Sequence, residues 1–155
     1  MSRIRVMIVD DQPIIRDGLE MILSLCGDIM VVYTAASGED AIKACGEIQT
    51  DVVLMDIRMP GMDGVKATKL IREKHADVKV IILTTFNDDE YIFEALRNGA
   101  SSYLLKDASS NEIVNAIKII HMGGTVLNGN VAERVVGKAT KPSGISREKP
   151  LLTSR

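Results

Sequence analysis

The sequence is poor in cysteine and in aromatic residues, and it has no long apolar run. Its two cysteines, Cys26 and Cys45, stand alone without CxxC spacing, which argues against cysteine-based metal or redox chemistry. We expect both to be small buried side chains in a reducing cytoplasm. No apolar stretch approaches the roughly 20 residues that a bilayer-spanning helix needs. The apolar N-terminal run meets acidic residues at once, unlike a secretory signal. These absences predict a cytoplasmic protein with no membrane partner.

Basic side chains are scarce in most of the chain and collect at its end. Residues 1–124 hold 13 basic and 19 acidic side chains, whereas residues 125–155 hold 6 basic and 2 acidic ones. The acidic part is a poor partner for a nucleic-acid backbone, and the basic part has no aromatic residue on which bases could stack. We therefore interpret residues 1–124 as one domain and residues 125–155 as a linker, with one short helix over residues 131–139.

Five short runs rich in β-branched residues alternate with stretches of helical periodicity. The first, third and fourth runs are almost entirely apolar, which is typical of strands covered on both faces. The runs predict strands over residues 4–9, 30–34, 52–55, 78–84 and 102–105. Regular alternation of strand and helix predicts an α/β fold with one parallel sheet. Right-handed crossovers would place helices on both faces of that sheet.

Capping residues mark the expected ends of several helices. Ser109, with Glu112 three residues later, has the pattern of a capping box. Ser37 is a typical N-cap for the second helix, and Gly99 stands where a C-terminal cap is needed before the fifth strand. The first helix is predicted from an apolar stripe at Ile15, Leu19, Ile22 and Cys26.

Polar side chains stand at the ends of four of the five predicted strands. Asp10 and Asp11 follow the first strand, Asp56 the third and Lys106 the fifth, and Thr84 ends the fourth. In a parallel α/β sheet, ligands bind at the edge where the carboxyl ends of the strands meet. Each residue alone is more simply a helix cap, a β-former or a surface charge. Their joint placement predicts a binding site.

Three carboxylates at one edge repel each other unless a cation lies among them. The oxygens are hard ligands and no histidine or cysteine joins them, which favours Mg²⁺, with Mn²⁺ as the alternative, over zinc. A divalent cation together with Lys106 and Thr84 would neutralise and position a phosphoryl group. A carboxylate can accept that group as an acyl phosphate. Asp56 is the best candidate, because it follows a central apolar strand between the other acids and the hydroxyl.

A longer motif surrounds each of these residues. The chain reads Val9-Asp10-Asp11, Met55-Asp56-Ile57-Arg58-Met59-Pro60-Gly61-Met62-Asp63-Gly64, Thr84-Thr85 and Tyr103-Leu104-Leu105-Lys106-Asp107. With these motifs, the chain resembles a two-component response-regulator receiver domain over about residues 3–122. The resemblance implies a flavodoxin-like (βα)5 fold, with a doubly wound parallel sheet in the strand order 2-1-3-4-5.

The resemblance also implies how the acids act. Asp56 would accept the phosphoryl group from a sensor histidine kinase in a Mg²⁺-dependent reaction. Asp11 and Asp56 would bind Mg²⁺ directly, Asp10 would act through bound water, and the backbone carbonyl of Arg58 would supply another ligand. Such a domain is a regulatory phosphoacceptor. It is not an enzyme in the usual sense, although it helps to catalyse its own phosphorylation and dephosphorylation.

The remaining site residues would respond to the phosphoryl group. Lys106 would pair with Asp56 and then with the phosphate. Thr84 would shift to hydrogen-bond a phosphoryl oxygen, and Tyr103 would swing inward to fill the space left behind. For Tyr103, a half-buried aromatic with only a structural role is the alternative interpretation.

The residue after Lys106 narrows the resemblance. With Asp107 at this position, the chain resembles members of the NarL/LuxR group. In those proteins a linker leads to a helix-turn-helix DNA-binding domain that often opens with Leu-Thr-x-Arg. Residues 152–155 read Leu-Thr-Ser-Arg, so we expect that the DNA-binding domain of a longer transcription regulator is missing from this chain. Phosphorylation would then drive homodimerisation, through either helix four, strand five and helix five or helices one and five.

Three other interpretations fit the residues less well. A phosphatase of the haloacid-dehalogenase kind needs a second acid two residues after the nucleophile, and this chain has Arg58 there. A nucleotide- or flavin-binding module needs glycines or a phosphate loop after the first strand, where this chain has Asp10-Asp11-Gln12-Pro13. A degenerate receiver that only binds partners would not need all the acids that are present.

Overall fold

The computed structural model describes residues 3–84 and 89–124, which alternate regularly between strand and helix. The predicted linker over residues 125–155, with its short helix over residues 131–139, lies outside the described residues and stays a prediction. The elements are β1 (Ile4–Val9), α1 (Pro13–Ser24), β2 (Ile29–Ala35), α2 (Gly38–Glu47), β3 (Val52–Asp56), α3 (Gly64–Lys74), β4 (Lys79–Thr84), α4 (Asp89–Arg97), β5 (Ser102–Leu105) and α5 (Ser110–His121).

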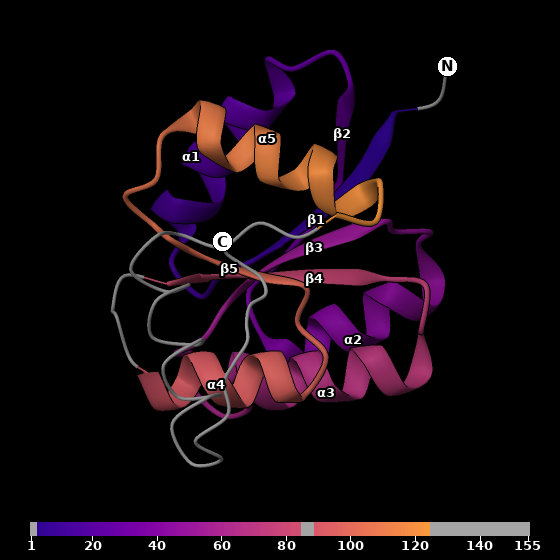
Figure 1. Cartoon of the computed structure of the whole chain (residues 1–155), viewed down its shortest axis with the longest axis vertical. Coiled ribbons are helices and arrows are strands. Elements are labelled where there is room, and N and C mark those ends of the chain that lie inside the picture. Colours follow the sequence, from indigo (N-terminus) through magenta and orange to yellow (C-terminus); the bar gives the residue numbers. More distant parts are fainter. Residues whose placement is uncertain (1–2, 85–88, 125–155) are drawn as a thin grey trace, which may run out of the picture.

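The five strands form one parallel sheet in the order β2-β1-β3-β4-β5, as predicted. Helices α1 and α5 cover one face of the sheet, and α2, α3 and α4 cover the other (Figure 1). Nearly every residue of β1, β3 and β4 is buried, because the two helical layers exclude water from both faces of these strands. Their apolar runs therefore build two hydrophobic cores, one on each side of the sheet.

The first predicted helix is shorter than its apolar stripe. It ends at Ser24, so Cys26 lies beyond it and is only partly buried, whereas Cys45 on α2 is buried. The backbone N–H groups of Leu25 and Cys26 bond to carbonyls three residues back, which tightens the chain out of the α-helix. The expectation that both cysteines are buried is confirmed for Cys45 alone, where burial raises the pKa of the thiol to about 11.

The predicted caps are present. Ser37 accepts a hydrogen bond from the backbone of Asp40 at 3.1 Å, and Ser109 and Glu112 form the reciprocal capping box. Gly99 follows α4 with a φ of +108°, a conformation that glycine adopts without strain. Asp63 caps α3 by accepting from the backbone of Lys66 at 2.9 Å, a role that the sequence analysis missed.

An ion pair ties β1 to the segment before β3 at the amino edge of the sheet. Asp51 accepts from the backbone N–H of Arg5 at 2.8 Å and from its guanidinium at 3.2 Å. Burial alone would raise the pKa of Asp51, but the hydrogen bonds and the charge of Arg5 outweigh it and lower that pKa below its usual value. This contact fixes the register of the two central strands at the edge opposite the predicted site.

None of the helices in the described ranges is both long and apolar enough to cross a membrane.

Candidate functional site

The carboxyl edge of the sheet brings the three predicted acids together. Asp10 and Asp11 follow β1, and Asp56 ends the neighbouring strand β3. One carboxylate oxygen from each lies within 4.8 Å of the others. Asp10 and Asp56 are buried, whereas Asp11 is partly exposed. Three hard oxygen ligands at this spacing, open to solvent on the side of Asp11, fit a Mg²⁺ or Mn²⁺ ion.

Lys106 extends from the end of β5 into this cluster. Its ammonium lies 3.2 Å from Oδ1 of Asp56, as predicted, and only 2.6 Å from Oδ2 of Asp10. Burial would lower the pKa of Lys106, but the hydrogen bond to Asp10 and the charges of both acids outweigh it and raise that pKa. Lys106 thus stays positively charged and bridges two of the acids. The sequence analysis predicted only the pair with Asp56.

Asp56 lies in an environment that opposes its ionisation. Burial is the main cause, followed by the negative charge of Asp10, and the two raise the pKa of Asp56 to about 6 even though Lys106 acts in the opposite direction. A carboxyl group with such a pKa gains from any cation that enters the cluster. Among the acids of the described chain, Asp56 therefore has the strongest physical reason to recruit a metal ion.

Thr84 lies where the prediction placed it. It ends β4 beside Asp56 on β3, and its residue is buried. The backbone N–H of Lys106 donates to the carbonyl of Thr84 at 2.6 Å, so the ends of β4 and β5 are joined. The hydroxyl-bearing residue and the ammonium-bearing residue are thus held side by side. The part that Thr84 plays in a switch stays a prediction.

Tyr103 is fully buried, so the half-burial in the alternative interpretation is wrong, whereas the purely structural role of that alternative stays open to test. It lies in the core between the sheet and the layer of α2, α3 and α4, and its exposed fraction is 0%. The alternation of side chains along β5 directs Tyr103 to that face. The structure thus contains the inward position that the resemblance associates with the phosphorylated state, and the movement itself stays a prediction.

The loop between β3 and α3 is anchored to the carboxyl edge by Gly64. A Cβ atom at this position would lie 2.0 Å from the carbonyl oxygen of Asp56, so no other residue fits without movement of the loop. The backbone N–H of Gly64 donates to the carbonyl of Ile57 at 2.7 Å. Arg58 points outward, with its guanidinium carbon 5.1 Å from the ring centre of Tyr91 on α4. Its backbone carbonyl as a metal ligand stays a prediction.

Arg16 contacts the site although the sequence analysis did not single it out. Its Nη1 donates to the backbone carbonyl of Asp10 at 2.6 Å. A signal was available, because side chains on an α-helix lean toward its N-terminus, and Arg16 stands one turn after the acids.

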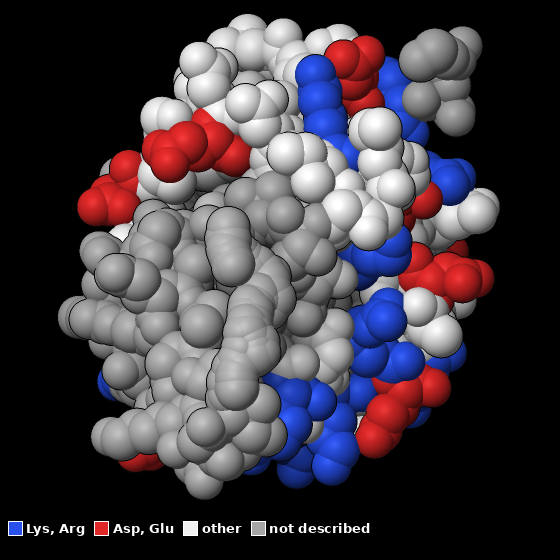
Figure 2. Space-filling view, viewed as in Figure 1, with Lys and Arg blue, Asp and Glu red and all other residues white. Residues whose placement is uncertain are grey.

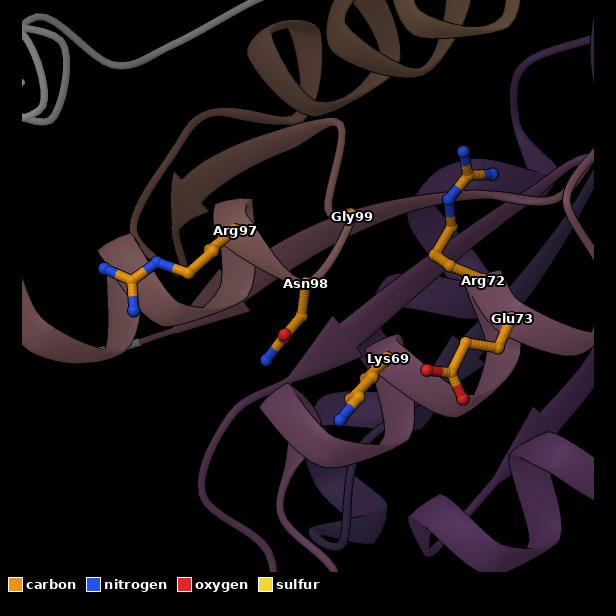
Figure 3. A pocket seen from close by; sticks show the side chains of 6 residues that line it. All are labelled: Lys69, Arg72, Glu73, Arg97, Asn98 and Gly99. Atoms are coloured by element: carbon orange, nitrogen blue, oxygen red, sulfur yellow. The ribbon is translucent and has the colours of Figure 1, made fainter.

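A second depression lies away from this cluster. A hollow of about 420 Å³ between the C-terminal ends of α3 and α4 is lined by Lys69, Arg72, Glu73, Arg97, Asn98 and Gly99 (Figure 3). Lys69 and Arg72 point in opposite directions, and Arg72 bonds to the carbonyls of Ala76 and Val78. The hollow therefore lacks the convergent polar groups that the carboxyl edge has.

Comparison with known proteins agrees with this geometry. The family model of the response regulator receiver domain matches residues 6–118. This chain belongs to the response-regulator receiver family. A receiver domain is a regulatory module, so family membership favours a regulator over the phosphatase and nucleotide-binding alternatives. The predicted flavodoxin-like fold is confirmed.

The receiver is similar to parts of longer bacterial regulatory proteins. Transcriptional regulatory protein LnrK of Bacillus subtilis (strain 168) is 49% identical over 124 residues, which cover 80% of this chain and 56% of that protein. Oxygen regulatory protein NreC of Staphylococcus carnosus (strain TM300) is 37% identical over 141 residues, which cover 90% of this chain and 65% of that protein. The chain thus spans between about half and two thirds of the length of these curated relatives.

Solved receiver structures place the chain in the NarL/LuxR group, as predicted. A LuxR-family two-component response regulator from Aurantimonas sp. SI85-9A1 superposes with a TM-score of 0.83 at 30% identity, covering 89% of this chain and 99% of that one. The signal receiver domain of the response regulator NarL from Mycobacterium tuberculosis gives a TM-score of 0.76 at 34% identity, covering 79% and 99%.

Proposed function

We propose that this receiver accepts a phosphoryl group on Asp56 from the phosphohistidine of a sensor kinase and thereby controls a DNA-binding domain outside this chain. The observation that carries the proposal is the convergence of three carboxylates and one ammonium at a single edge of the sheet. Asp56 is buried between the strands that present the other acids and Thr84. It therefore lies between the other acids, which could bind a metal ion, and the hydroxyl-bearing residue.

In the transfer, a carboxylate oxygen of Asp56 forms a bond to phosphorus while the bond from phosphorus to the imidazole nitrogen breaks. The imidazole keeps the electron pair of that bond and leaves as the neutral ring, because its other ring nitrogen already carries a proton. Asp56 must be ionised to attack, and its raised pKa shows that the cluster without a metal opposes this state. Mg²⁺ held by Asp11 and Asp56, with Asp10 acting through water and the Arg58 carbonyl as a further ligand, would supply the missing positive charge. Mn²⁺ is the alternative ion.

Lys106 and Thr84 act on the transferred group. Lys106 lies 3.2 Å from Oδ1 of Asp56. Its ammonium neutralises the negative charge of the phosphoryl oxygens when the phosphoryl group is transferred to that carboxylate. Thr84, on the neighbouring strand, would shift so that its hydroxyl hydrogen-bonds a phosphoryl oxygen. Tyr103 would then fill the space left behind by swinging inward, toward the position that it has in this structure. Apart from helping its own phosphorylation and dephosphorylation, the domain performs no turnover.

The test is labelling by a small phosphodonor. The chain is incubated with acetyl phosphate and Mg²⁺, and its intact mass is measured. We expect a gain of one phosphoryl group in the wild type and in Asp77→Asn, an exposed acid outside the site, and none in Asp56→Asn or in the presence of EDTA. Equal labelling of the Asp56→Asn variant would refute the assignment.

DNA contact is assigned to a helix-turn-helix domain beyond residue 155. In Figure 2, Lys and Arg are interspersed with Asp and Glu on the right-hand side of this face. In the sequence of helix α3, four basic residues likewise stand together with Glu73. A mixed surface of this kind differs from the single-sign strip that tracks a phosphate backbone. The sensor kinase, a second copy of the chain and this DNA-binding domain are the proposed partners, and the cytoplasm is the proposed location.

The second copy is proposed to dock on α1 and α5. Among the described residues, large exposed apolar side chains gather on or directly after these two helices: Ile14, Met21, Leu25, Ile119 and Met122. Helices α1 and α5 contact each other, so these side chains share one side of the molecule. A two-fold interface pairs a surface with itself, and an exposed apolar surface is suited to that. These exposed side chains favour helices one and five over the surface of α4, β5 and α5.

Sedimentation with beryllofluoride, a mimic of the phosphoryl group, tests the interface. We expect the wild type to dimerise when Mg²⁺ and beryllofluoride are added. Leu25→Glu should remain monomeric, because a charge would be buried in the apolar contact. Glu94→Lys on α4 is the matched control and should still dimerise. The opposite pattern would assign the interface to α4, β5 and α5.

A further inference from the structure

In the turn between β1 and α1, every polar atom of Asp10 takes part in a hydrogen bond or an ion pair. Its backbone N–H donates to the carbonyl of Ala35 at 3.1 Å. Its Oδ1 accepts from the backbone N–H of Gln12 at 2.9 Å, and its Oδ2 accepts from Lys106 at 2.6 Å. Its carbonyl oxygen accepts from Nη1 of Arg16 at 2.6 Å. Arg16 therefore completes the fixation of this residue.

Asp11, the next residue, is in the opposite situation. Within residues 3–84 and 89–124 its carboxylate has no hydrogen-bond or ion-pair partner, and one of its oxygens lies in the acidic cluster. Nothing that the structure describes holds this side chain directly. Its direction depends on the peptide group that joins Asp10 to Asp11, because that plane orients the backbone of Asp11. The carbonyl oxygen of this peptide group is the atom that Arg16 binds.

Among the described contacts, helix α1 has no side-chain N-cap. Its N-cap, Gln12, makes no side-chain capping bond, Pro13 opens the helix, and the first turn contains no acid. The side chains of Asp10 and Asp11, which could cap the helix, belong to the cluster instead. Arg16 reaches back from the helix to the Asp10 carbonyl and so takes over the anchoring that a cap normally provides.

We propose that Arg16 is a positioning residue for the metal site: by holding the Asp10 carbonyl, it fixes the peptide group before Asp11 and thereby aims the Asp11 carboxylate into the cluster. The inference rests on the proposed binding of Mg²⁺ by Asp11 and Asp56. It adds a residue on α1 that touches neither the metal nor the phosphoryl group.

The charge of Arg16 makes the inference easy to separate from a simple electrostatic effect. A guanidinium beside the cluster repels a divalent cation, so its removal would tighten Mg²⁺ binding if charge were its only contribution. Loss of positioning acts in the opposite direction. Removing residues that orient metal ligands typically weakens metal binding by about 10- to 100-fold. Whether Mg²⁺ affinity falls or rises when Arg16 is replaced therefore distinguishes a positioning role from a purely electrostatic one.

The experiment is a calorimetric Mg²⁺ titration of the whole chain. We expect Arg16→Met to bind Mg²⁺ about tenfold more weakly than the wild type, and Arg16→Lys, which keeps the charge and a donor, to lie between them. Lys43→Met removes an equal charge from an exposed position on α2 and should bind like the wild type. Equal or tighter binding by Arg16→Met overturns the inference. A wild type that binds no Mg²⁺ overturns the proposed function as well.

A second measurement needs no metal and applies even if a variant is less stable. Amide hydrogen exchange at Gln12, whose N–H bonds to Asp10, reports how firmly the turn is held. In EDTA, we expect this amide to exchange faster in Arg16→Met than in the wild type, while amides in β3 keep their protection. Unchanged exchange at Gln12 would show that Arg16 does not hold the turn.

Discussion

Replacing Asp56 by asparagine should stabilise the metal-free domain at neutral pH. Burial and the charge of Asp10 raise the pKa of Asp56 from 3.8 to about 6. The folded state therefore holds the proton more tightly than the unfolded chain does, and ionisation at neutral pH works against folding. Asparagine has nearly the same shape and carries no charge, so it removes this penalty.

The pKa shift sets the size and the pH range of the effect. At about 1.4 kcal/mol per pKa unit, a shift of roughly two units corresponds to at most about 3 kcal/mol. This shift already includes the opposing effect of Lys106. The asparagine amide must still find hydrogen-bond partners in the cluster, so we expect a net stabilisation of about 1–2 kcal/mol at pH 7.5. The proton's contribution is fully present below the unfolded pKa, near 3.8, and is lost as the pH rises through 6. The advantage of the variant should therefore shrink below pH 6 and vanish near pH 4.

Urea unfolding followed by circular dichroism measures the effect. Wild type, Asp56→Asn and the exposed-acid control Asp77→Asn are compared in EDTA at pH 7.5 and pH 4.5. The control should differ from the wild type by less than about 0.5 kcal/mol. Saturating Mg²⁺ should stabilise the wild type and narrow the gap to Asp56→Asn. If Asp56→Asn is no more stable than the wild type at pH 7.5 in EDTA, burial and repulsion do not govern this carboxyl.

Two further predictions concern the scaffold. Gly64→Ala should lower the free energy of unfolding by at least about 2 kcal/mol, because the new Cβ atom would overlap the carbonyl oxygen of Asp56. Gly18→Ala lies inside helix α1, and its Cβ atom would meet nothing within 4 Å, so this variant should gain up to about 1 kcal/mol. Equal effects in urea unfolding would contradict this. Asp51→Asn should lower the free energy of unfolding by about 1 kcal/mol at pH 7, because it removes the ion pair with Arg5. Arg5 lowers the pKa of Asp51 in the folded state, so the stability that this pair contributes is present above the pKa of the unfolded chain. The cost should disappear as the pH falls through the folded pKa, and a pH-independent cost would show that packing rather than charge is responsible.

The fold could be predicted closely, because the signals that determine it are local. The apolar runs that became β1, β3 and β4 must be covered on both faces, and Ser37 and Ser109 cap helices by contacts within their own turns. The prediction was wrong at the end of helix α1. The stripe that included Cys26 overran α1 because periodicity does not register the tightening of its last turn. For Tyr103, the sequence left half-burial open as an alternative, because a short edge strand does not show how deep its inner face lies.

The identity of the site residues is likewise a property of the sequence. Asp10, Asp11, Asp56, Thr84 and Lys106 each stand at a strand end, and parallel topology alone gathers strand ends at one edge. Their oxygens and single ammonium are the basis on which the sequence predicts a hard cation and a phosphoryl group. What the chain order could not specify is how these groups pair across the cluster.

Those pairings belong to the tertiary structure. Lys106 lies closer to Asp10 than to Asp56, and Arg58 lies over Tyr91. Each depends on distances of a few ångströms between segments far apart in the chain or on side-chain directions that spacing does not report. The raised pKa of Asp56 has the same origin, because burial and neighbouring charge exist only once the strands are packed. The sequence thus determined which chemical groups meet at the carboxyl edge, and the packed fold decided which of them hold one another and how strongly each binds its proton.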